Sequence, residues 1–320
     1  MDLQTYTPYL LGTFILLFSL LAYLQLAPKW GIIDNPNHRS SHTRPTVRGG
    51  GILIPIAVVL AYIFSGYQYP WMMVSILLVS VISFVDDIRE LSPKLRLPFQ
   101  MLAVILMLYS AGLPMTWWAI PVFILAMGMM NAYNFMDGIN GITGLYSLVC
   151  LGFLGSEMYS LDILSPAWVL FPAIACILFL YANFRKRALC FLGDVGSISL
   201  ALLVLFLLGK LILYTAQPLY ALFLLVYGLD AGLTVIQRWR RGEDLMSAHR
   251  SHLYQYLTKP GPYSHRQVAV AFAILQMGIN GITLVLIRQD PTISYVGASL
   301  MILFSIPVYL VVKKRFTPET

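Results

Sequence analysis

The chain has 320 residues, of which 58% are hydrophobic and 11% are charged, and its formal net charge is +7. A soluble globular domain carries roughly 25% charged residues, so the composition excludes a soluble protein and indicates one integral membrane domain over residues 1–320. The positive charge lies between apolar segments, which predicts membrane topology rather than a nucleic-acid partner.

Eleven apolar segments predict an all-α, polytopic membrane protein with about 11 transmembrane helices. A spanning helix needs about 20 mostly apolar residues, and lipid permits no exposed irregular backbone. The second, third and fourth segments are short for a span. In chain order the segments cover residues 9–27, 51–65, 70–85, 97–112, 116–132, 142–160, 166–183, 195–214, 217–236, 267–287 and 293–312.

The polar loops fall alternately into two sets, and 19 of the 21 Lys and Arg residues lie in one of them. Only Lys210 and Arg288 lie outside that set. Because cytoplasmic loops carry an excess of Lys and Arg, we expect a periplasmic N-terminus and a cytoplasmic C-terminus. The basic set comprises residues 28–50, 86–96, 133–141, 184–194, 237–266 and 313–320.

The first basic loop reads DNPNHRSSHTRPTVRGGG over residues 34–51. It offers Arg39, His42, Arg44 and Arg48 directly before a run of glycines. Arginine side chains and glycine N–H groups bind phosphate well. A basic loop that only sets topology would look the same by itself.

Two adjacent acids, Asp86 and Asp87, close the third apolar segment. Neighbouring carboxylates repel each other and are costly to desolvate, so a bound cation or a phosphate chemistry would explain keeping both. An acidic helix end near Arg89, Lys94 and Arg96 is the alternative.

The segment NAYNFMDGINGITG, residues 131–144, contains three asparagines, one aspartate and three glycines. Glycines let the backbone approach a ligand, and Asn and Asp supply hydrogen-bonding groups. A polar turn that caps the next helix is the alternative. Since a plain turn rarely needs so many amide side chains, we favour a ligand-binding loop.

The segment FLGDVGS, residues 191–197, places Asp194 between two glycines where a span begins. A carboxylate there could hold Mg²⁺, which prefers one or two carboxylates together with phosphate oxygens and water. Aspartate is also a good N-cap, and that structural reading is favoured for the motif by itself.

The last basic loop, residues 238–257, carries His249 and His252 with Arg250 between them. The two histidines would share one face of a helix. We expect them to bind pyrophosphate rather than zinc, because no Cys or Glu partner lies close by; a solvated basic helix is the alternative. Asp230 lies inside the ninth segment, and we favour an ion pair or hydrogen bond there that fixes helix packing.

Taken in order, these motifs resemble the polyprenyl-phosphate N-acetylhexosamine-1-phosphate transferases of the MraY/WecA type. The resemblance runs from about Asp34 to Leu257 and is closer to the WecA branch, which includes O-antigen-initiating members. It is carried by the segments DNPNHRSSHTRPTVRGGG, FVDD, NAYNFMDGINGITG, NFRKRALCFLGDVGS and RSHLYQ.

The resemblance implies transfer of an N-acetylhexosamine 1-phosphate, or of a 6-deoxy N-acetylamino sugar 1-phosphate, from a UDP-sugar to undecaprenyl phosphate. UMP would leave, and the product would start a cell-envelope glycan. The implied cofactor is Mg²⁺, with Mn²⁺ as an alternative. The implied location is the bacterial inner (cytoplasmic) membrane, with the active site facing the cytoplasm; a homodimer is left open.

The resemblance also implies roles for individual residues. Asp194 matches the metal ligand of the family. Asp86, Asp87, Asp137 and His252 match residues of the catalytic centre. The residues expected to bind substrate are Arg39, His42, Arg48, Asn131, Asn134, Asn183, His249 and Arg250.

The last loop departs from the family pattern. WecA-type relatives often carry a His-x-His-His run, whereas Leu253, Tyr254 and Gln255 follow His252 here. Since this loop lies near the sugar and diphosphate in the family, the sequence leaves the sugar open. A muramyl-pentapeptide substrate is not favoured, because the family members that use it have three consecutive histidines and ten spans.

An ion-coupled membrane transporter is the competing function. Transporters place acids and broken helices near the bilayer midplane, at the interface of two repeats. In this sequence the acids lie mainly at one edge of the predicted spans, and no paired halves are visible.

Overall fold

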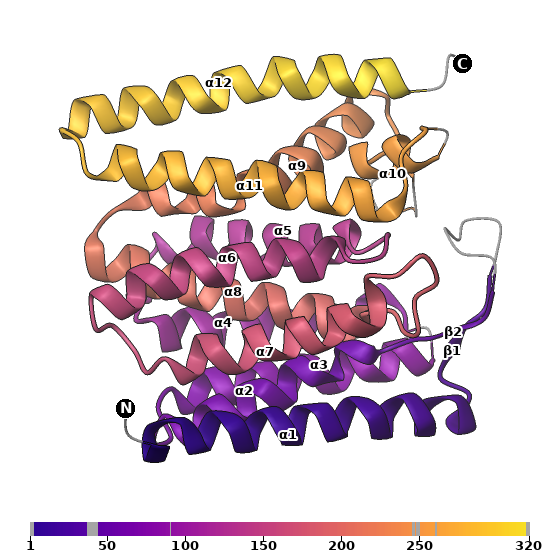
Figure 1. Ribbon diagram of the computed structural model, residues 1–320. Coiled ribbons are helices and arrows are strands. Elements are labelled where there is room, and N and C mark those ends of the chain that lie inside the picture. Colours follow the sequence, from indigo (N-terminus) through magenta and orange to yellow (C-terminus); the bar gives the residue numbers. More distant parts are fainter. Residues whose placement is uncertain are drawn as a thin grey trace.

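A computed structural model describes residues 3–36, 44–89, 91–244, 247, 250–259 and 261–317, with side chains from Tyr6 onward. The chain forms a bundle of helices that run roughly alongside one another (Figure 1). The long helices are α1 (Leu3–Leu26), α2 (Leu53–Phe64), α3 (Pro70–Ile88), α4 (Pro93–Ala111), α5 (Ala119–Met136), α6 (Ile142–Ser160), α7 (Ala167–Asn183), α8 (Gly193–Thr215), α9 (Leu225–Arg240), α11 (His265–Ile287) and α12 (Pro291–Phe316).

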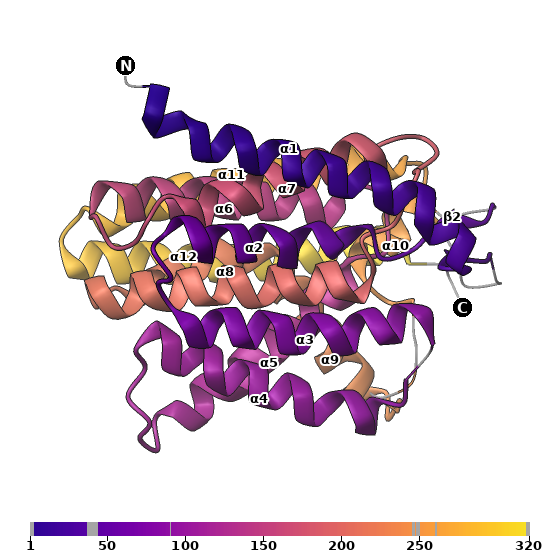
Figure 2. The same cartoon turned by 90° about the horizontal axis from the view of Figure 1, so that it is seen from below.

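Helix α8 forms the centre of the bundle. It packs against α2, α3, α4, α5 and α6, and Figure 2 shows it enclosed by its neighbours. In an 18-residue apolar stretch of α8, 78% of the residues are buried, whereas in the corresponding stretch of α12 only 11% are buried. An apolar helix that is buried on all sides belongs to a protein interior, and one that is apolar but exposed needs lipid around it.

The remaining elements are short. They are three 3₁₀ helices (Ala27–Trp30, Gly50–Ile52 and Pro218–Leu224), the helix α10 (Leu253–Thr258) and an antiparallel pair of two-residue strands, β1 (Ile33–Asp34) and β2 (Thr46–Val47). The expected all-α class is therefore confirmed, with this one small hairpin added.

Each of the eleven predicted apolar segments coincides with a helix, and the 217–236 segment begins in the 3₁₀ helix before α9. Eight helical segments of the described residues are long and apolar enough to cross a membrane. Helices α2 and α7 are apolar but shorter. A multi-pass membrane protein is thus confirmed, while eleven spans remain a prediction.

Several helices extend further than their apolar segments, and in two of them the added residues belong to the polar motifs. The predicted third segment ends at residue 85, but α3 continues to Ile88 and includes Asp86 and Asp87. The predicted fifth segment ends at residue 132, but α5 continues to Met136. Backbone hydrogen bonds hold a helix together whatever its side chains are, so polarity marks the end of the apolar segment and not the end of the helix.

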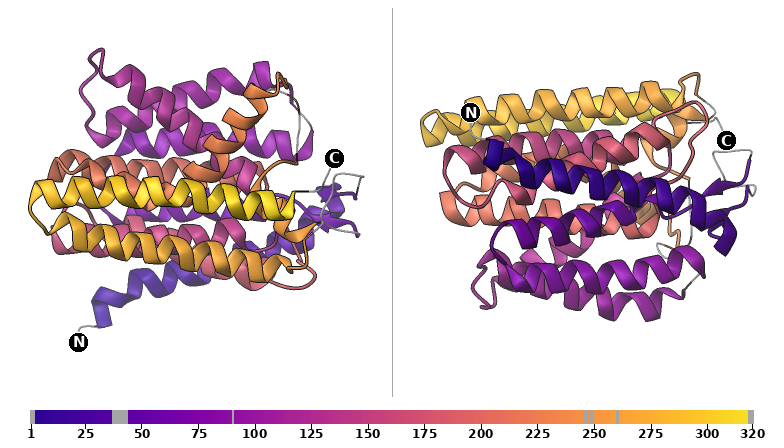
Figure 3. Two further views of the ribbon diagram at one scale, coloured as in Figure 1. Left: turned by 90° about the horizontal axis from the view of Figure 1, so that it is seen from above. Right: turned by 60° about the horizontal axis from the view of Figure 1, so that its bottom comes forward.

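The polar segments gather at one end of the bundle, where α3 and α5 end and α8 begins; we call this the polar end (Figure 1). The strand pair and α10 lie there too. Helix α1 begins at the opposite end and α12 ends at the polar end. Figure 3 shows α11 and α12 as adjacent outer helices on one side of the bundle.

Candidate active site

Backbone hydrogen bonds attach the first basic loop to the start of α8. Val47 forms a parallel bridge with Cys190. The N–H groups of Gly50 and Gly51 donate to the carbonyls of Phe191 and Leu192, both at 2.8 Å. A Cβ on Gly51 would collide with the backbone of α8, so the glycine run permits an approach that places the preceding residue, Arg48, over the first turn of α8.

Asp87 accepts the free N–H groups at the start of α8. Its Oδ1 accepts the N–H of Asp194 at 2.9 Å and its Oδ2 accepts that of Val195 at 3.1 Å. The N-cap position is Leu192, which has no capping side chain. The reading of Asp194 as an N-cap is therefore wrong, because a carboxylate from α3 satisfies these donors and Asp194 lies inside the first turn.

Arg48 joins two of the carboxylates. Its Nε lies 2.8 Å from Asp87 Oδ1, and one terminal nitrogen lies 3.4 Å from Asp194 Oδ1. Burial lowers the pKa of Arg48, but the charges of Asp87 and Asp194 outweigh it, so the pKa lies above its ordinary value. Arg48 is therefore a permanent cation in contact with both acids.

Arg96 joins the third carboxylate to the same group. Its Nη1 lies 2.6 Å from Asp86 Oδ2 and 3.0 Å from Asp194 Oδ2. The other oxygen of Asp86 accepts the N–H of Leu91 at 2.6 Å. In the sequence Arg96 stands out only as a basic neighbour of the paired acids; the short link between α3 and α4 was the signal that it returns to them.

The asparagines of the second motif lie on the last turns of α5. Asn134 donates to Ser197 Oγ on α8 at 3.2 Å. Asn131 donates to the carbonyl of Met127 within its own helix at 2.8 Å. The structure thus brings Asn134 to the first turns of α8, where Asp194 lies, and places Asn131 one turn earlier on α5.

Asp137 follows α5 directly and completes the acidic group. Burial, together with the charges of Asp194 and Asp87, raises the pKa of Asp137 to about 7, while Thr143 and the charge of Arg48 act in the opposite direction. A carboxyl group that senses these three charges lies in the same site. Asp86, Asp87, Asp137 and Asp194 therefore converge, as predicted.

Asn183 connects the two loops that surround the acids. Its Oδ1 accepts the N–H of Gly141 at 2.6 Å, and its Nδ2 donates to the carbonyl of Cys190 at 2.8 Å. A second asparagine, Asn140, donates to the carbonyl of Arg185 at 2.9 Å. Since both polar atoms of the buried Asn183 amide bond to backbone, the geometry gives this residue a positioning role rather than direct contact with substrate.

His252 lies beside the second motif, at the start of α10. Its Nδ1 lies 3.3 Å from Asp230 Oδ1, and its ring packs against Phe135. The neighbouring Tyr254 donates to the carbonyl of Phe135 at 2.9 Å. His252 precedes α10 and does not lie within a helix, so the expected shared helical face with His249 does not extend to this position.

Asp230 fixes helix packing, as predicted. It is 1% exposed, and its Oδ1 accepts hydrogen bonds from the N–H of Leu253 at 3.0 Å and from Tyr309 Oη at 2.9 Å. One carboxylate of α9 thus holds both α10 and α12. The same oxygen faces His252, so Asp230 also orients the histidine.

Three predicted substrate-binding residues, Arg39, His42 and His249, lie outside the described residues. Arg250 is described and exposed. The described part of the site therefore consists of the four acids, Arg48, Arg96, Asn134 and the His252–Asp230 pair.

A match to a known family covers the centre of this site. The model of the family described as "Glycosyl transferase family 4" matches residues 69–212. That stretch includes both aspartates at the end of α3, the α5–α6 connection, Asn183 and Asp194.

Curated relatives extend the similarity over most of the chain. A "Probable undecaprenyl-phosphate N-acetylglucosaminyl 1-phosphate transferase" of Bacillus subtilis (strain 168) is 26% identical over 92% of this chain and 89% of its own length. An "Undecaprenyl-phosphate alpha-N-acetylglucosaminyl 1-phosphate transferase" of Yersinia pestis is 28% identical over 86% of this chain and 85% of its own. One of Escherichia coli (strain K12) is 26% identical over 86% and 82%. Over residues 69–212 the chain is therefore similar to glycosyl transferase family 4.

The acids of the site suit a divalent cation whose remaining ligands would be oxygens of the substrate. Among the residues that the structure describes, no three His, Cys, Asp or Glu side chains lie close enough to enclose a metal. Mg²⁺ is commonly bound by one or two carboxylates together with phosphate oxygens and water. The carboxylate of Asp194, with two arginines beside it and some exposure, fits that arrangement.

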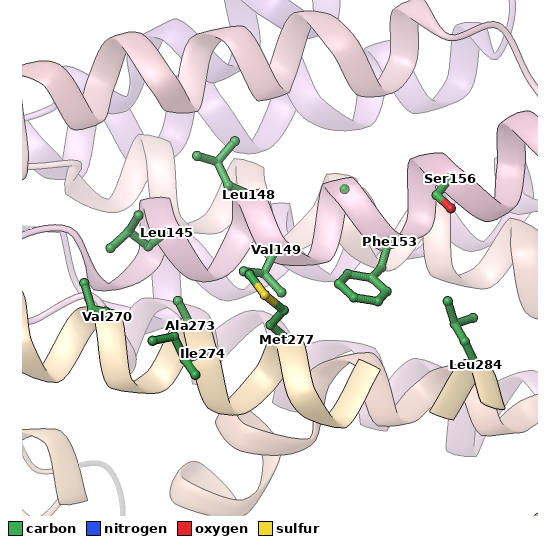
Figure 4. A pocket seen from close by; sticks show the side chains of 11 residues that line it. Leu145, Leu148, Val149, Phe153, Ser156, Val270, Ala273, Ile274, Met277 and Leu284 are labelled. Atoms are coloured by element: carbon green, nitrogen blue, oxygen red, sulfur yellow. The ribbon is translucent and has the colours of Figure 1, made fainter. Parts of the chain in front are cut away.

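A separate apolar cavity of about 500 Å³ lies between α6 and α11 (Figure 4). It is lined by side chains such as Leu148, Phe153 and Met277, and Ser156 is its only hydroxyl among the described lining residues. A cavity without titratable groups offers no acid, base or phosphate ligand. It is therefore not a second candidate for the active site.

Proposed function

We propose that the chain transfers an N-acetylhexosamine 1-phosphate from a UDP-sugar to undecaprenyl phosphate. The observation that carries the proposal is the convergence of four acids and two arginines at the polar end. At this end a lipid phosphate at the membrane surface would meet a soluble nucleotide. The printed names of the relatives supply the substrates, and they favour N-acetylglucosamine as the first sugar to test. A 6-deoxy N-acetylamino sugar is the alternative.

The proposed reaction exchanges one phosphoanhydride bond for another. A phosphate oxygen of the lipid attacks the sugar-bearing β-phosphorus of the UDP-sugar and forms a new P–O bond. The bond from that phosphorus to the bridging oxygen breaks, and UMP leaves with the electron pair. A phosphate monoester already carries about −1.5 to −2 charges at pH 7, so the attack needs no strong general base.

The arginines are suited to hold the phosphates. Arg48 and Arg96 present fixed donors beside Asp194, and guanidinium groups bind phosphate oxygens in pairs. A diphosphate bound at this position would accept hydrogen bonds from the guanidinium N–H groups of Arg48 and Arg96, which contact Asp194 in this structure. His252 approaches from α10, and its partner Asp230 holds its Nδ1, so its Nε2 side is directed away from that carboxylate.

The proposed cofactor is Mg²⁺, with Mn²⁺ as an alternative, and Asp194 is its proposed protein ligand. When bound, the cation would stabilise the negative charge that develops on the leaving phosphate. Asp87 plays a different part, because it holds the first turn of α8 and so sets the position of Asp194. Asp86 holds Arg96 beside Asp194, and Asp137 with Asn134 closes the site from the α5 side.

The proposed topology has eleven spans with the polar end in the cytoplasm of a bacterium, in the inner membrane. The bias of Lys and Arg toward the loops of that end supports it. A start of α1 and an end of α12 at opposite ends of the bundle agree with an odd number of spans (Figure 1). The whole chain would act as one domain, a homodimer is left open, and the glycan that the product starts is left to experiment.

Transfer activity tests the proposal directly. The purified protein is incubated with undecaprenyl phosphate, Mg²⁺ and a panel of UDP-sugars, and released UMP is measured. We expect UMP release with at least one UDP-N-acetylhexosamine, loss of it with a chelator, and loss in the variant Asp194→Asn. The matched control is Asp162→Asn, which makes the same change on an exposed residue after α6, at the other end of the bundle.

Two results would contradict the proposal. Activity of the Asp194→Asn variant equal to that of the unchanged protein would remove Asp194 from the site. Absence of UMP release with every sugar, together with ion-dependent uptake by vesicles, would favour the transporter. The position of the acids argues against that outcome, because they lie at the polar end and not near the middle of the spans.

A further inference from the structure

A positively charged cavity lies between α9, the start of α10 and the end of α12, and none of the four converging acids lines it. Its volume is about 310 Å³. Four cations line it, and no carboxylate does among the described lining residues. The cations are Arg238, Arg241, Lys313 and Lys314.

The ammonium group of Lys313 lies inside this cavity with neutral partners. The residue is 5% exposed. Among the described residues its Nζ donates to Thr234 Oγ1 at 2.8 Å and to Tyr309 Oη at 3.0 Å. An ammonium has three N–H donors, and the carboxylate of Asp230 is linked to Lys313 through Tyr309 and Thr234. The site therefore favours an anion that takes the third donor.

The nearby acids do not balance these charges. Glu243 lies 2.8 Å from Arg238 Nε and 3.7 Å from Arg241 Nη1. A second carboxylate, Asp230, lies behind Tyr309 and Thr234 and also accepts the N–H of Leu253. These two carboxylates do not balance the four cations of the cavity. Arg238 is further tied to the loop carbonyl of Asp244 at 2.6 Å, so its position is fixed. Arg238 and Lys313 are therefore buried, held cations, and the exposed Arg241 and Lys314 add charge at the mouth of the cavity.

The surroundings indicate that the anion is attached to a lipid. The cavity lies at the polar ends of two membrane-spanning segments. The outer face of α12 next to it is apolar, with Val311 69% exposed, and Trp239 of α9 is 68% exposed. Tryptophan is typical of the membrane–water boundary, and basic pockets between spans at the cytoplasmic face bind phospholipid headgroups.

We propose that this cavity binds the phosphate group of an anionic phospholipid, with the acyl chains along the outer face of α12 (Figure 3). The site is distinct from the four converging acids, and Asp230 lies between it and His252: Tyr309 contacts both Lys313 and Asp230, and Asp230 contacts the histidine. The proposal does not depend on the transferase reaction.

Native mass spectrometry of the purified full-length protein tests the proposal. Phosphatidylglycerol and phosphatidylcholine of equal chain length are titrated, and bound lipid is counted. The test variant is Arg241→Gln with Lys314→Gln, which removes two exposed cations of the cavity and leaves Lys313 in place. The matched control is Arg240→Gln with Arg315→Gln, which removes two neighbours on the same helices that do not line the cavity.

We expect one phosphatidylglycerol to bind at least about tenfold more tightly than phosphatidylcholine, a preference that two cations at a membrane surface are able to supply. The cavity variant should lose this preference and the control variant should retain it. Equal loss in both variants, or no loss in either, would overturn the proposal.

Two competition arms distinguish the source of the phosphate. We expect neither inorganic phosphate at millimolar concentration nor undecaprenyl phosphate to displace phosphatidylglycerol. Displacement by inorganic phosphate would show a site for a soluble anion, and displacement by undecaprenyl phosphate would show a second site for the acceptor. Either result would refute a phospholipid site.

Discussion

Asp87, in the last turn of α3, accepts the backbone N–H of Asp194, in the first turn of α8, at 2.9 Å. This contact joins the second acid of the paired motif to the proposed metal ligand. It also means that two adjacent aspartates act differently: Asp87 holds backbone, whereas Asp86 holds a guanidinium group. The sequence left these roles undivided.

Gly193→Ala should abolish transfer, because Gly193 has φ +74° and an added Cβ would overlap the carboxylate of Asp87. The first turn of α8 would have to move, and with it Asp194. We expect UMP release to fall by at least about 100-fold, equivalent to about 2.7 kcal/mol. Gly209→Ala is the matched control on the same helix, since its Cβ would meet only Ala111 at 3.5 Å; equal effects of both changes would contradict the close-approach argument.

Arg96→Gln should lower kcat/KM by about 10- to 100-fold, because it removes the shared donor of Asp86 and Asp194 and one proposed phosphate ligand. Steady-state UMP release at varied UDP-sugar concentration measures the effect. The control is Arg89→Gln, which removes an exposed arginine from the same α3–α4 link. An active Arg96→Gln variant would exclude this residue from the substrate site.

Asp137→Asn should stabilise the protein at high pH while it destroys activity. The pKa of Asp137 is raised to about 7 by burial and by its acidic neighbours, against an ordinary value near 3.9. Ionised Asp137 therefore costs folding free energy, and this cost grows from about pH 4 to about pH 7 and then levels off. After a discount for the partial exposure of the group, we expect about 2 kcal/mol.

Thermal unfolding in a chelator, with and without the Asp137→Asn change, measures this difference. The melting temperatures should be similar near pH 4 and separate as the pH rises to 7, with the variant more stable. A variant that is less stable than the unchanged protein at pH 8 would show that the ionised carboxylate is favourable in the folded site, contrary to this prediction.

His252→Ala should reduce turnover by about 100-fold, the magnitude typical of a single positioned acid, base or phosphate ligand. His252 contacts Phe135 of the α5 motif and is held by Asp230. The control is His265→Ala, which removes a histidine at the start of α11; its turnover should remain within about threefold of the unchanged protein. Equal losses would remove the assignment of His252 to the site.

The helices could be predicted from sequence because each apolar segment is long enough to form a helix, and an apolar segment in lipid must be helical. The helix ends could not, since α3 and α5 continue through polar residues whose side chains bond locally or across the bundle, as Asn131 and Asn134 do. The gathering of the acids was predicted from the shared end of their spans and from family resemblance.

Contacts between distant segments escaped prediction. Nothing in the sequence near Asp194 shows that Asp87 satisfies its backbone, or that Arg96 reaches it from α4. Asn183 looked like a ligand, but both ends of its amide are taken by Gly141 and Cys190. The role of each of these residues depends on which distant side chains and backbone groups the packing of the helices brings beside it. The spacing of residues along the chain does not predict those neighbours.

The pairing of Arg48 with Asp194 has a consequence for biosynthesis, since the two residues are 146 positions apart. At about 5 to 20 residues per second of synthesis, the arginine waits about 7 to 30 seconds for its partner to leave the ribosome. During that interval Arg48 has Asp87 of α3 as its partner, and Arg96 has Asp86. Insertion of α8 is therefore the step at which Asp194 joins both arginines, before α9 and α10 add Asp230 and His252.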